Sequence, residues 1–271
     1  MKLQDKLQTL SLERKAILAV NFYNFETLSG ILQAAAAENQ PIILQVSEST
    51  IRYLGLKIAV SLARTALFDY GVTGWLHLDH GSSPEIVRQC LDAGFDSVMI
   101  DASEKPFDEN VRITRQVVEM ASQFNANVEA ELGYVAKLGQ SQGDSSFTRP
   151  TDAKKFVERT GVNALAVAIG TAHGFYKSPP ELQIRLLKEI RRATPAALVL
   201  HGSSGIPDEM LRDAIRAGIS KINLATETKN IFMKTLKKEL LQTDEIDLRK
   251  VFPLATGAVT DLISQKINVV Y

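Results

Sequence analysis

The sequence predicts a single closed (β/α)8 barrel, and three observations carry this prediction. Short apolar runs and helical segments alternate eight times along the chain. The runs are continuously apolar, as expected of parallel strands that are buried on both faces. The chain has 271 residues, and eight strand–helix units in about 250 residues is the usual size of such a barrel. We therefore expect one domain over residues 1–271, with an extra helical segment at its C-terminal end.

An open, doubly wound sheet is the main alternative to a closed barrel. In that fold the first strand is commonly followed by a Gly-x-Gly-x-x-Gly turn that binds a dinucleotide. The corresponding turn here, residues 21–25, reads Asn-Phe-Tyr-Asn-Phe and has no glycine. This difference counts against the dinucleotide-binding fold.

Each expected strand is a short apolar run followed by a helical pattern. The strands are expected at 17–22, 41–47, 74–78, 96–101, 127–132, 164–169, 197–200 and 221–224. The helices are expected at 26–38, 56–70, 84–93, 108–124, 151–160, 181–193, 207–217 and 227–241, followed by an amphipathic segment at 248–267. One long irregular stretch, 133–150, interrupts this rhythm, and a loop longer than about 12–15 residues in a compact domain is usually functional or disordered.

Composition excludes several classes of protein. The 31 basic and 31 acidic residues balance to a net charge of zero, so no global field attracts nucleic acid or an acidic membrane. The single cysteine, Cys90, is expected to be a buried thiol, and it rules out a disulfide framework. No apolar run approaches the roughly 18 residues of a membrane span, and the N-terminus has no signal core. We expect a soluble cytoplasmic protein without nucleic-acid or membrane partners.

All four histidines fall at strand ends. His77 and His80 lie at the end of the third expected strand, His173 follows the sixth, and His201 follows the seventh. Enzymes of this fold build their sites at the C-terminal ends of the strands. Three imidazoles, from His80, His173 and His201, suit zinc with one position open to water or substrate. Other divalent transition metals also accept imidazole, and any single histidine could instead be a core residue bonded to a backbone carbonyl.

Carboxylates crowd the same rim. Asp79 and Asp101 end the third and fourth strands, and Glu129 and Glu131 lie on the fifth. Strand side chains alternate, so His77 shares a face with Asp79, and Glu129 shares one with Glu131. Buried carboxylates must be paired, hydrogen-bonded or close to a metal. Direct chemistry and a supporting role that holds the imidazoles in place both remain open for Asp101, Glu129 and Glu131.

The last third of the chain predicts a phosphate pocket. Glycine-rich turns follow the sixth and seventh strands at 170–174 and 201–205, and 223–226 ends the eighth strand, with Thr226 as the expected N-cap of the next helix. Glycines and helix N-termini present backbone N–H groups to anions. Loops seven and eight are the usual phosphate location in this fold, and ordinary tight turns are the alternative.

Taken together, these motifs resemble the class II, zinc-dependent ketose-bisphosphate aldolases, a family that includes fructose- and tagatose-1,6-bisphosphate aldolases. The similarity runs from about Lys15 to Lys266. Its motifs are 19–22 (AVNF), 43–47 (ILQVS), 77–81 (HLDHG), 97–101 (SVMID), 128–133 (VEAELG), 164–174, 200–207 and 221–226.

The resemblance implies a reaction and a set of metal ligands. A zinc ion would be held by His80, His173 and His201, with Glu131 near it and Asp101 beside a second, divalent or monovalent, cation. Asp79 would move the proton of the hydroxyl group whose neighbouring C–C bond breaks. The expected activity is reversible aldol cleavage of a ketose phosphate or bisphosphate to dihydroxyacetone phosphate and an aldehyde.

The resemblance also implies contacts with the substrate, and the amphipathic segment at 248–267 offers a surface for a second subunit. The expected substrate contacts are Asn24, Ser47, Gly174, Gly202, Ser203, Ser204, Asn223, Ala225 and Thr226. The run 225–227 is closer to the tagatose-type branch than to the fructose-specific one. The apolar face of 248–267 is expected to support a homodimer or homotetramer.

Three departures from the family pattern leave the substrate open. The stretch 133–150 usually carries an acidic pair that handles the enediolate proton, and here Asp144 is its only carboxylate. The family's His-Gly-Gly-Ser-Gly is His-Gly-Ser-Ser-Gly at 201–205. No arginine lies near 254–257 for a distal phosphate, and Arg249 is the nearest. The alternatives are therefore a ketose 1-phosphate that yields a non-phosphorylated aldehyde, or a non-catalytic sugar-phosphate-binding partner subunit.

Overall fold

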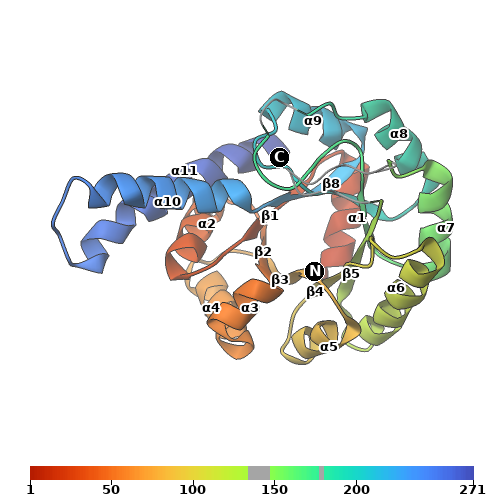
Figure 1. Cartoon of the computed structure of the whole chain (residues 1–271), viewed down its shortest axis with the longest axis horizontal. Helices are drawn as coiled ribbons and strands as arrows, with labels where there is room; N and C mark the ends of the chain where they lie inside the picture. The colour runs from red at the N-terminus through yellow and green to blue at the C-terminus, as the bar shows by residue number, and fades with distance from the viewer. Residues whose placement is uncertain (134–146, 177–179) are drawn as a thin grey trace.

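Eight parallel strands close into a barrel in the order of the chain, which confirms the predicted fold (Figure 1). The structure is a computed structural model that describes residues 1–133, 147–176 and 180–271. The strands are β1 (Ile17–Asn21), β2 (Ile42–Ser47), β3 (Gly74–Gly81), β4 (Ser97–Ile100), β5 (Asn127–Leu132), β6 (Ala164–Val167), β7 (Ala197–Leu200) and β8 (Ile219–Leu224). The third strand is three residues longer than expected, and the eighth begins two residues earlier.

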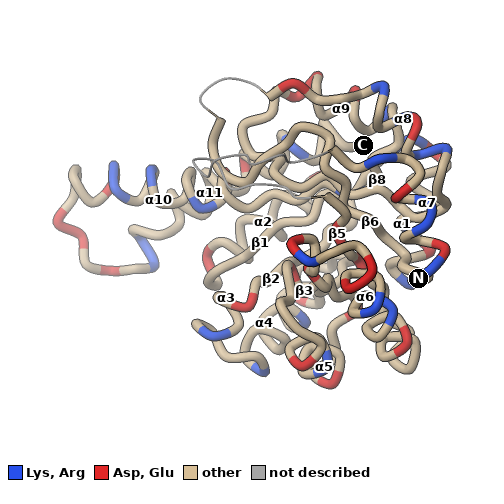
Figure 2. Tube along the Cα trace, turned by 45° about the vertical axis from the view of Figure 1, so that its right-hand side comes forward, with Lys and Arg blue, Asp and Glu red and all other residues tan. Residues whose placement is uncertain are grey.

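Nine of the helices follow the predicted segments and cover the barrel. They are α2 (Phe25–Ala37), α4 (Leu56–Asp69), α5 (Pro84–Asp92), α6 (Phe107–Ser122), α7 (Pro150–Thr160), α8 (Ile184–Ala193), α9 (Asp208–Ala217), α10 (Thr226–Leu240) and α11 (Leu248–Val270). Two further helices, α1 (Leu3–Glu13) and α3 (Glu48–Leu54), were not predicted. Acidic and basic residues are interspersed over the outer helices (Figure 2).

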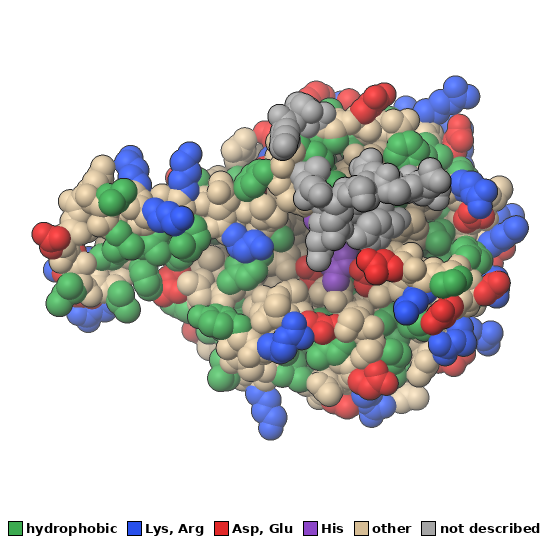
Figure 3. All heavy atoms as spheres, in the orientation of Figure 1, with side chains coloured by type: hydrophobic (Ala, Val, Ile, Leu, Met, Phe, Trp, Pro, Cys, Tyr) green, Lys and Arg blue, Asp and Glu red, His purple; other side chains and the backbone are tan. Residues whose placement is uncertain are grey.

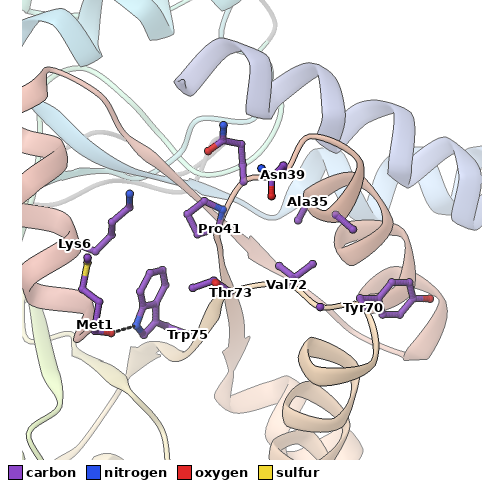
Figure 4. Close-up of a pocket in the computed structure, with 12 residues that line it drawn as sticks. Met1, Lys6, Ala35, Asn39, Pro41, Tyr70, Val72, Thr73 and Trp75 are labelled. Carbon is purple, nitrogen blue, oxygen red and sulfur yellow. Dashed lines mark hydrogen bonds between the residues drawn. The ribbon is translucent and has the colours of Figure 1, made fainter.

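Helix α1 closes the N-terminal end of the barrel. Leu3, Leu7 and Leu10 are each 1% exposed and belong to one apolar cluster with inward-facing strand residues such as Ile17 and Ala197. Beside α1 a cavity of about 280 Å³ opens between the ends of α2 and α4 (Figure 4). The indole Nε1 of Trp75 lines this cavity and donates to the carbonyl of Met1 over 3.3 Å. The N-terminal end of the barrel is therefore closed, and enzymes of this fold build their sites at the C-terminal ends of the strands.

The middle of the barrel interior is polar. Strand register places Gln45 beside His77, His77 beside Ser97, and Ser97 beside Asn127. His77 bonds to Ser97, and Asp79 bonds to Asn21 of β1, so both face the interior as the alternation of β3 predicts. Between the apolar cluster that contains α1 and the C-terminal ends of the strands, the barrel interior therefore carries hydrogen-bonding side chains.

Helices α10 and α11 form an arm that extends away from the barrel, and the second half of α11 returns along α2 (Figure 1). The arm carries exposed apolar side chains near its far end. These are Leu240, Leu241, Ile246, Leu248 and Leu254. Within the described residues, no helix has both the length and the hydropathy that a membrane span requires.

Candidate active site

Four potential metal ligands from different strand ends converge at the mouth of the barrel. They are His80 on β3, Glu131 on β5, His173 in the turn after β6 and His201 directly after β7, and one ligand atom from each lies within 4.8 Å of all the others. In the space-filling view, histidine is visible at the mouth beside acidic side chains (Figure 3). Four of the five predicted metal residues, the three histidines and Glu131, therefore form one cluster. Imidazole and carboxylate together are a donor set that suits zinc and similar divalent ions.

An irregular backbone turns His80 towards this cluster. Neighbouring residues of a regular strand face opposite sides, so Asp79 and His80 would diverge. The register between β3 and β4 shifts between Leu78 and Gly81, and His80 has a φ of 52°. A left-handed conformation costs a non-glycine residue about 1–2 kcal/mol, and here it brings both side chains to the barrel mouth.

His80 and His201 face each other through one ring nitrogen each, and a carboxylate bonds to the other nitrogen of each ring. Asp101 Oδ2 lies 2.6 Å from His80 Nδ1, and Glu129 Oε1 lies 2.8 Å from His201 Nε2. The remaining nitrogens, His80 Nε2 and His201 Nδ1, face each other across 3.1 Å. A second-nitrogen bond to a carboxylate fixes the tautomer and orientation of an imidazole that binds metal. The residues therefore fit a divalent cation, and Asp101 lies outside the four-residue cluster, where it orients His80.

These contacts set the protonation of the site. Burial alone would raise the pKa of Asp101 and of Glu129. The bond from His80 instead holds the pKa of Asp101 well below its usual range, and Lys221 does the same for Glu129. Burial and the neighbouring histidines lower the pKa of His173 to about 3, so its imidazole is neutral, as a metal ligand must be.

A buried lysine compensates the charge of Glu129. Lys221 of β8 is 1% exposed, and its Nζ lies 2.8 Å from Glu129 Oε2. His77 lies nearby, with Nε2 3.4 Å from Lys221 Nζ and Nδ1 2.7 Å from Ser97 Oγ. Burial and the charge of Lys221 lower the pKa of His77 to about 3. Lys221 is a charged residue on a strand of the barrel, and that was the signal by which it could have been found.

Asp79 is held beside the cluster by an ordered chain of amides. Gln45 Nε2 donates to Asn21 Oδ1 over 3.0 Å, and Asn21 Nδ2 donates to Asp79 Oδ2 over 2.8 Å. The other oxygen, Oδ1, lies 4.0 Å from His80 Nε2. Burial favours the protonated acid, but the charges of His80 and His201 and the bond from Asn21 lower the pKa of Asp79 below its ordinary value. The carboxylate is therefore ionised and available as a base; sequence reasoning missed Asn21 and Gln45.

The predicted phosphate loops surround a cavity of about 70 Å³ next to Asp79. Its lining comprises Asn21, Asp79, His80, His173, Gly174, Gly202, Ser203, Ser204, Asn223, Ala225 and Thr226. Seven of the nine predicted substrate contacts are in this set. Gly202 is required there, because its φ is 64° and a Cβ atom would lie 2.5 Å from the carbonyl oxygen of Ala172.

Side chains tie these loops together. The hydroxyl of Tyr176 donates to the carbonyl of Gly202 over 2.7 Å, and Ser203 Oγ donates to the carbonyl of Asn223. Thr226 is the first residue of α10, not its N-cap as predicted; the cap is Ala225, which has no side-chain oxygen. Of the first N–H groups of α10, that of Glu227 donates to Ser204 Oγ over 3.3 Å. The N-terminus of a helix has further backbone donors, and these suit an anion.

The other predicted residues lie elsewhere. Asn24 and Ser47 each cap a helix: their side chains accept from the backbone N–H of Thr27 and Thr50 at the starts of α2 and α3. Asp144 lies outside the described residues. Thr148, near the end of the predicted irregular stretch 133–150, donates through Oγ1 to the carbonyl of Leu132 over 2.5 Å.

Comparisons with known proteins identify the family that this site comes from. The family model for class II fructose-bisphosphate aldolases matches residues 1–271. A fructose-bisphosphate aldolase from Geobacillus stearothermophilus is 41% identical over 261 residues, which is 93% of this chain and 90% of the relative. The crystal structure of the YdjI aldolase from Escherichia coli K12 superposes with a TM-score of 0.89 at 32% identity, covering 99% of this chain and 96% of that one. The fructose-bisphosphate aldolase of Campylobacter jejuni shares the fold, with a TM-score of 0.84 at 22% identity over 99% of this chain and 93% of its own.

Proposed function

Because the chain belongs to the class II fructose-bisphosphate aldolase family and is a lyase, we propose that it cleaves a ketose phosphate reversibly to dihydroxyacetone phosphate and an aldehyde, with zinc as its metal. The observation that carries this proposal is the convergence of His80, Glu131, His173 and His201 beside the ionised Asp79. The three histidines and Glu131 would hold the ion, with Asp101 and Glu129 orienting two of the imidazoles. A divalent cation bound there would supply Lewis-acid polarisation of the ketose carbonyl.

The chain's own groups would divide the remaining work. Asp79 accepts the proton of the hydroxyl group next to the breaking C–C bond and returns it during condensation. Asn21 holds one carboxylate oxygen, so that the other faces the reacting hydroxyl. The loops at 202–204 and 223–226 would bind the phosphate of dihydroxyacetone phosphate and fix the reacting carbons close to Asp79. Asp144 would handle the proton of the three-carbon fragment, and Asn24 and Ser47 would contact the substrate while capping their helices.

A test of this function is a cleavage assay on epimeric ketose mono- and bisphosphates, with and without a chelator. We expect dihydroxyacetone phosphate from at least one ketose phosphate, loss of its release after chelation, and its return with zinc. Absence of zinc from the purified protein together with no dihydroxyacetone phosphate from any substrate would overturn the proposal. Retention of Asp79 and all three histidines argues against a non-catalytic partner subunit.

A non-phosphorylated aldehyde product is a second candidate, which one observation favours. The described residues that line the site cavity include no lysine or arginine for a distal phosphate. Arg249 lies on the arm and bonds to Asp247 of the same segment, with Nη2 2.9 Å from Oδ2. Condensing dihydroxyacetone phosphate with glyceraldehyde or with glyceraldehyde 3-phosphate separates the two, because this candidate predicts a higher kcat/KM for the neutral aldehyde.

We include a homodimer or homotetramer in the cytoplasm in the proposal. The apolar tip of the arm, which includes Leu241 (88% exposed) and Ile246 (90% exposed), would be buried by a symmetric partner. Light scattering of the purified protein tests this: a monomer at micromolar concentration would contradict it. The lone buried thiol of Cys90 is compatible with a reducing compartment.

A further inference from the structure

A strongly basic cavity lies at the end of the barrel opposite the metal cluster. Its volume is about 470 Å³, and it opens where α1, α8 and α9 end, just before β1, β7 and β8 begin. Its lining includes Arg14, which follows α1, and Lys188, Arg191 and Arg192 of α8. The lining contains no acidic residue. We call this feature the basic cavity.

The four positive charges of the basic cavity have no carboxylate partners. Among residues 1–133, 147–176 and 180–271, no ion pair involves any of the four. The nearest acidic residues along the chain are engaged elsewhere: Glu13 pairs with Lys15 at 3.7 Å, and Glu189 pairs with Arg185 at 3.4 Å. Like charges that are grouped without counter-charges repel one another, so an anion placed among them is stabilised.

The fold positions two of these guanidinium groups. Arg14 Nη1 donates to the carbonyl of Arg216 over 2.7 Å, and Arg191 Nη1 donates to the carbonyl of Thr194 over 3.0 Å. Gly218 makes room for the stem of Arg191, since a Cβ atom at this position would lie 2.7 Å from Arg191 Cγ, and its φ is 127°. Burial, followed by the charge of the nearby Arg14, lowers the pKa of Arg191.

Helix C-termini explain part of this arrangement. Carbonyl groups at the ends of helices attract cations, and the bonds from Arg14 and Arg191 both serve that purpose. A guanidinium has five N–H donors, however, and one carbonyl bond leaves several of them for another acceptor. Helix capping therefore does not account for four cations around one cavity.

A buried hydroxyl lies behind the same wall. Ser11 lines the cavity, is 7% exposed, and its Oγ has no hydrogen-bond partner among the described residues. A buried polar group without a partner costs about 1–3 kcal/mol, so such groups are rare without a reason. The Oγ of Ser11 is almost inaccessible to solvent and lies behind the cavity surface, so the guanidinium and ammonium groups alone would contact an oxyanion there.

We propose that the basic cavity binds a small anion carrying two or more phosphate groups, held by Arg14, Lys188, Arg191 and Arg192. Planar guanidinium groups suit phosphate oxygens, and a cavity of this size suits a small molecule better than a polymer surface. This ligand site is separate from the phosphate pocket beside Asp79, because the two lie at opposite ends of the barrel.

Calorimetric titration with inorganic triphosphate tests the basic cavity. The titration uses the full chain with its metal bound, at constant ionic strength. We expect the double variant Arg191→Gln/Arg192→Gln to bind triphosphate at least about tenfold more weakly, since charge-assisted bonds are lost. The matched control Arg115→Gln removes an exposed arginine that pairs with Glu119 on α6, and it should leave the affinity unchanged.

A second variant separates the basic cavity from the catalytic phosphate pocket. Arg14→Gln removes one of the four cations and should weaken triphosphate binding by a smaller factor without changing aldol cleavage. Equal affinity in the wild type and in the Arg191→Gln/Arg192→Gln variant would overturn the proposal. So would affinity that falls equally in the Arg115→Gln control.

Discussion

Glu129 and Lys221 form an ion pair inside the barrel, 2.8 Å apart, with both side chains almost fully buried. The pair lies directly behind His201, because the second oxygen of Glu129 accepts from that imidazole. Removing one partner of a buried pair leaves an uncompensated charge. The interior of the barrel and the metal cluster are therefore linked through one carboxylate.

The first prediction concerns stability. Lys221→Met should lower the free energy of unfolding by about 3–5 kcal/mol, because the carboxylate of Glu129 would remain buried without its partner. Urea denaturation of the metal-free protein measures this. The double variant Lys221→Met/Glu129→Gln should recover much of the loss. If it is as unstable as the single variant, the ion pair is not the source of the effect.

The second prediction concerns metal affinity. Glu129→Gln keeps the size of the side chain but removes the charge that orients His201, so affinity for zinc should fall by about 10–100-fold. His201→Ala should lose metal binding more severely. Competition with a fluorescent chelator measures both affinities. The control Glu85→Gln, on the exposed surface of α5, should bind as the wild type does, and an unchanged affinity in Glu129→Gln would refute the orienting role.

The third prediction separates positioning from binding. Asn21→Ala removes the donor that holds Asp79, so kcat should fall by about 10–100-fold while KM for the ketose phosphate changes little. Gln45→Ala, one step further from Asp79, should lower kcat by a smaller factor. Steady-state kinetics at saturating zinc gives both values. A rise in KM at constant kcat would instead assign Asn21 to ground-state binding.

The fourth prediction concerns the single thiol. Burial, followed by the charge of Glu48, raises the pKa of Cys90 to about 12, so little thiolate exists near neutral pH. Alkylation with iodoacetamide at about pH 8 should be slow in the folded protein and complete in guanidinium chloride. Rapid modification of the folded chain would show that α5 opens readily.

The strands were predictable because the physical signal was local. Buried parallel strands such as 164–167 and 197–200 are continuous apolar runs, and these were found nearly to the residue. Helix α1 was missed although Leu3, Leu7 and Leu10 have helical spacing. These leucines are buried because they pack against the open N-terminal end of the barrel. That surface exists only after the eight strands have closed. Helix α3 has only seven residues and begins at the Ser47 cap.

The sequence indicated the candidate metal ligands and left a supporting role open for Asp101 and Glu129, but it did not indicate the groups that hold these residues in place. His80, His173 and His201 stood out because histidine is uncommon at the ends of apolar runs. The backbone irregularity that turns His80 inwards depends on pairing between β3 and β4, which the sequence does not display. Three supporting residues were missed for a related reason: Lys221, Asn21 and Gln45. Each bonds to a partner on a strand that is distant in sequence.

The central claim is that Asp79 moves a proton beside a metal held by three histidines and Glu131. The most direct measurement determines bound zinc and the rate of dihydroxyacetone phosphate release in the same preparation of Asp79→Asn. We predict one zinc ion per chain, as in the wild type, and a rate lower by about 10²–10⁴-fold, the usual contribution of an acid–base group. Cleavage at the wild-type rate by the zinc-loaded variant would contradict the account.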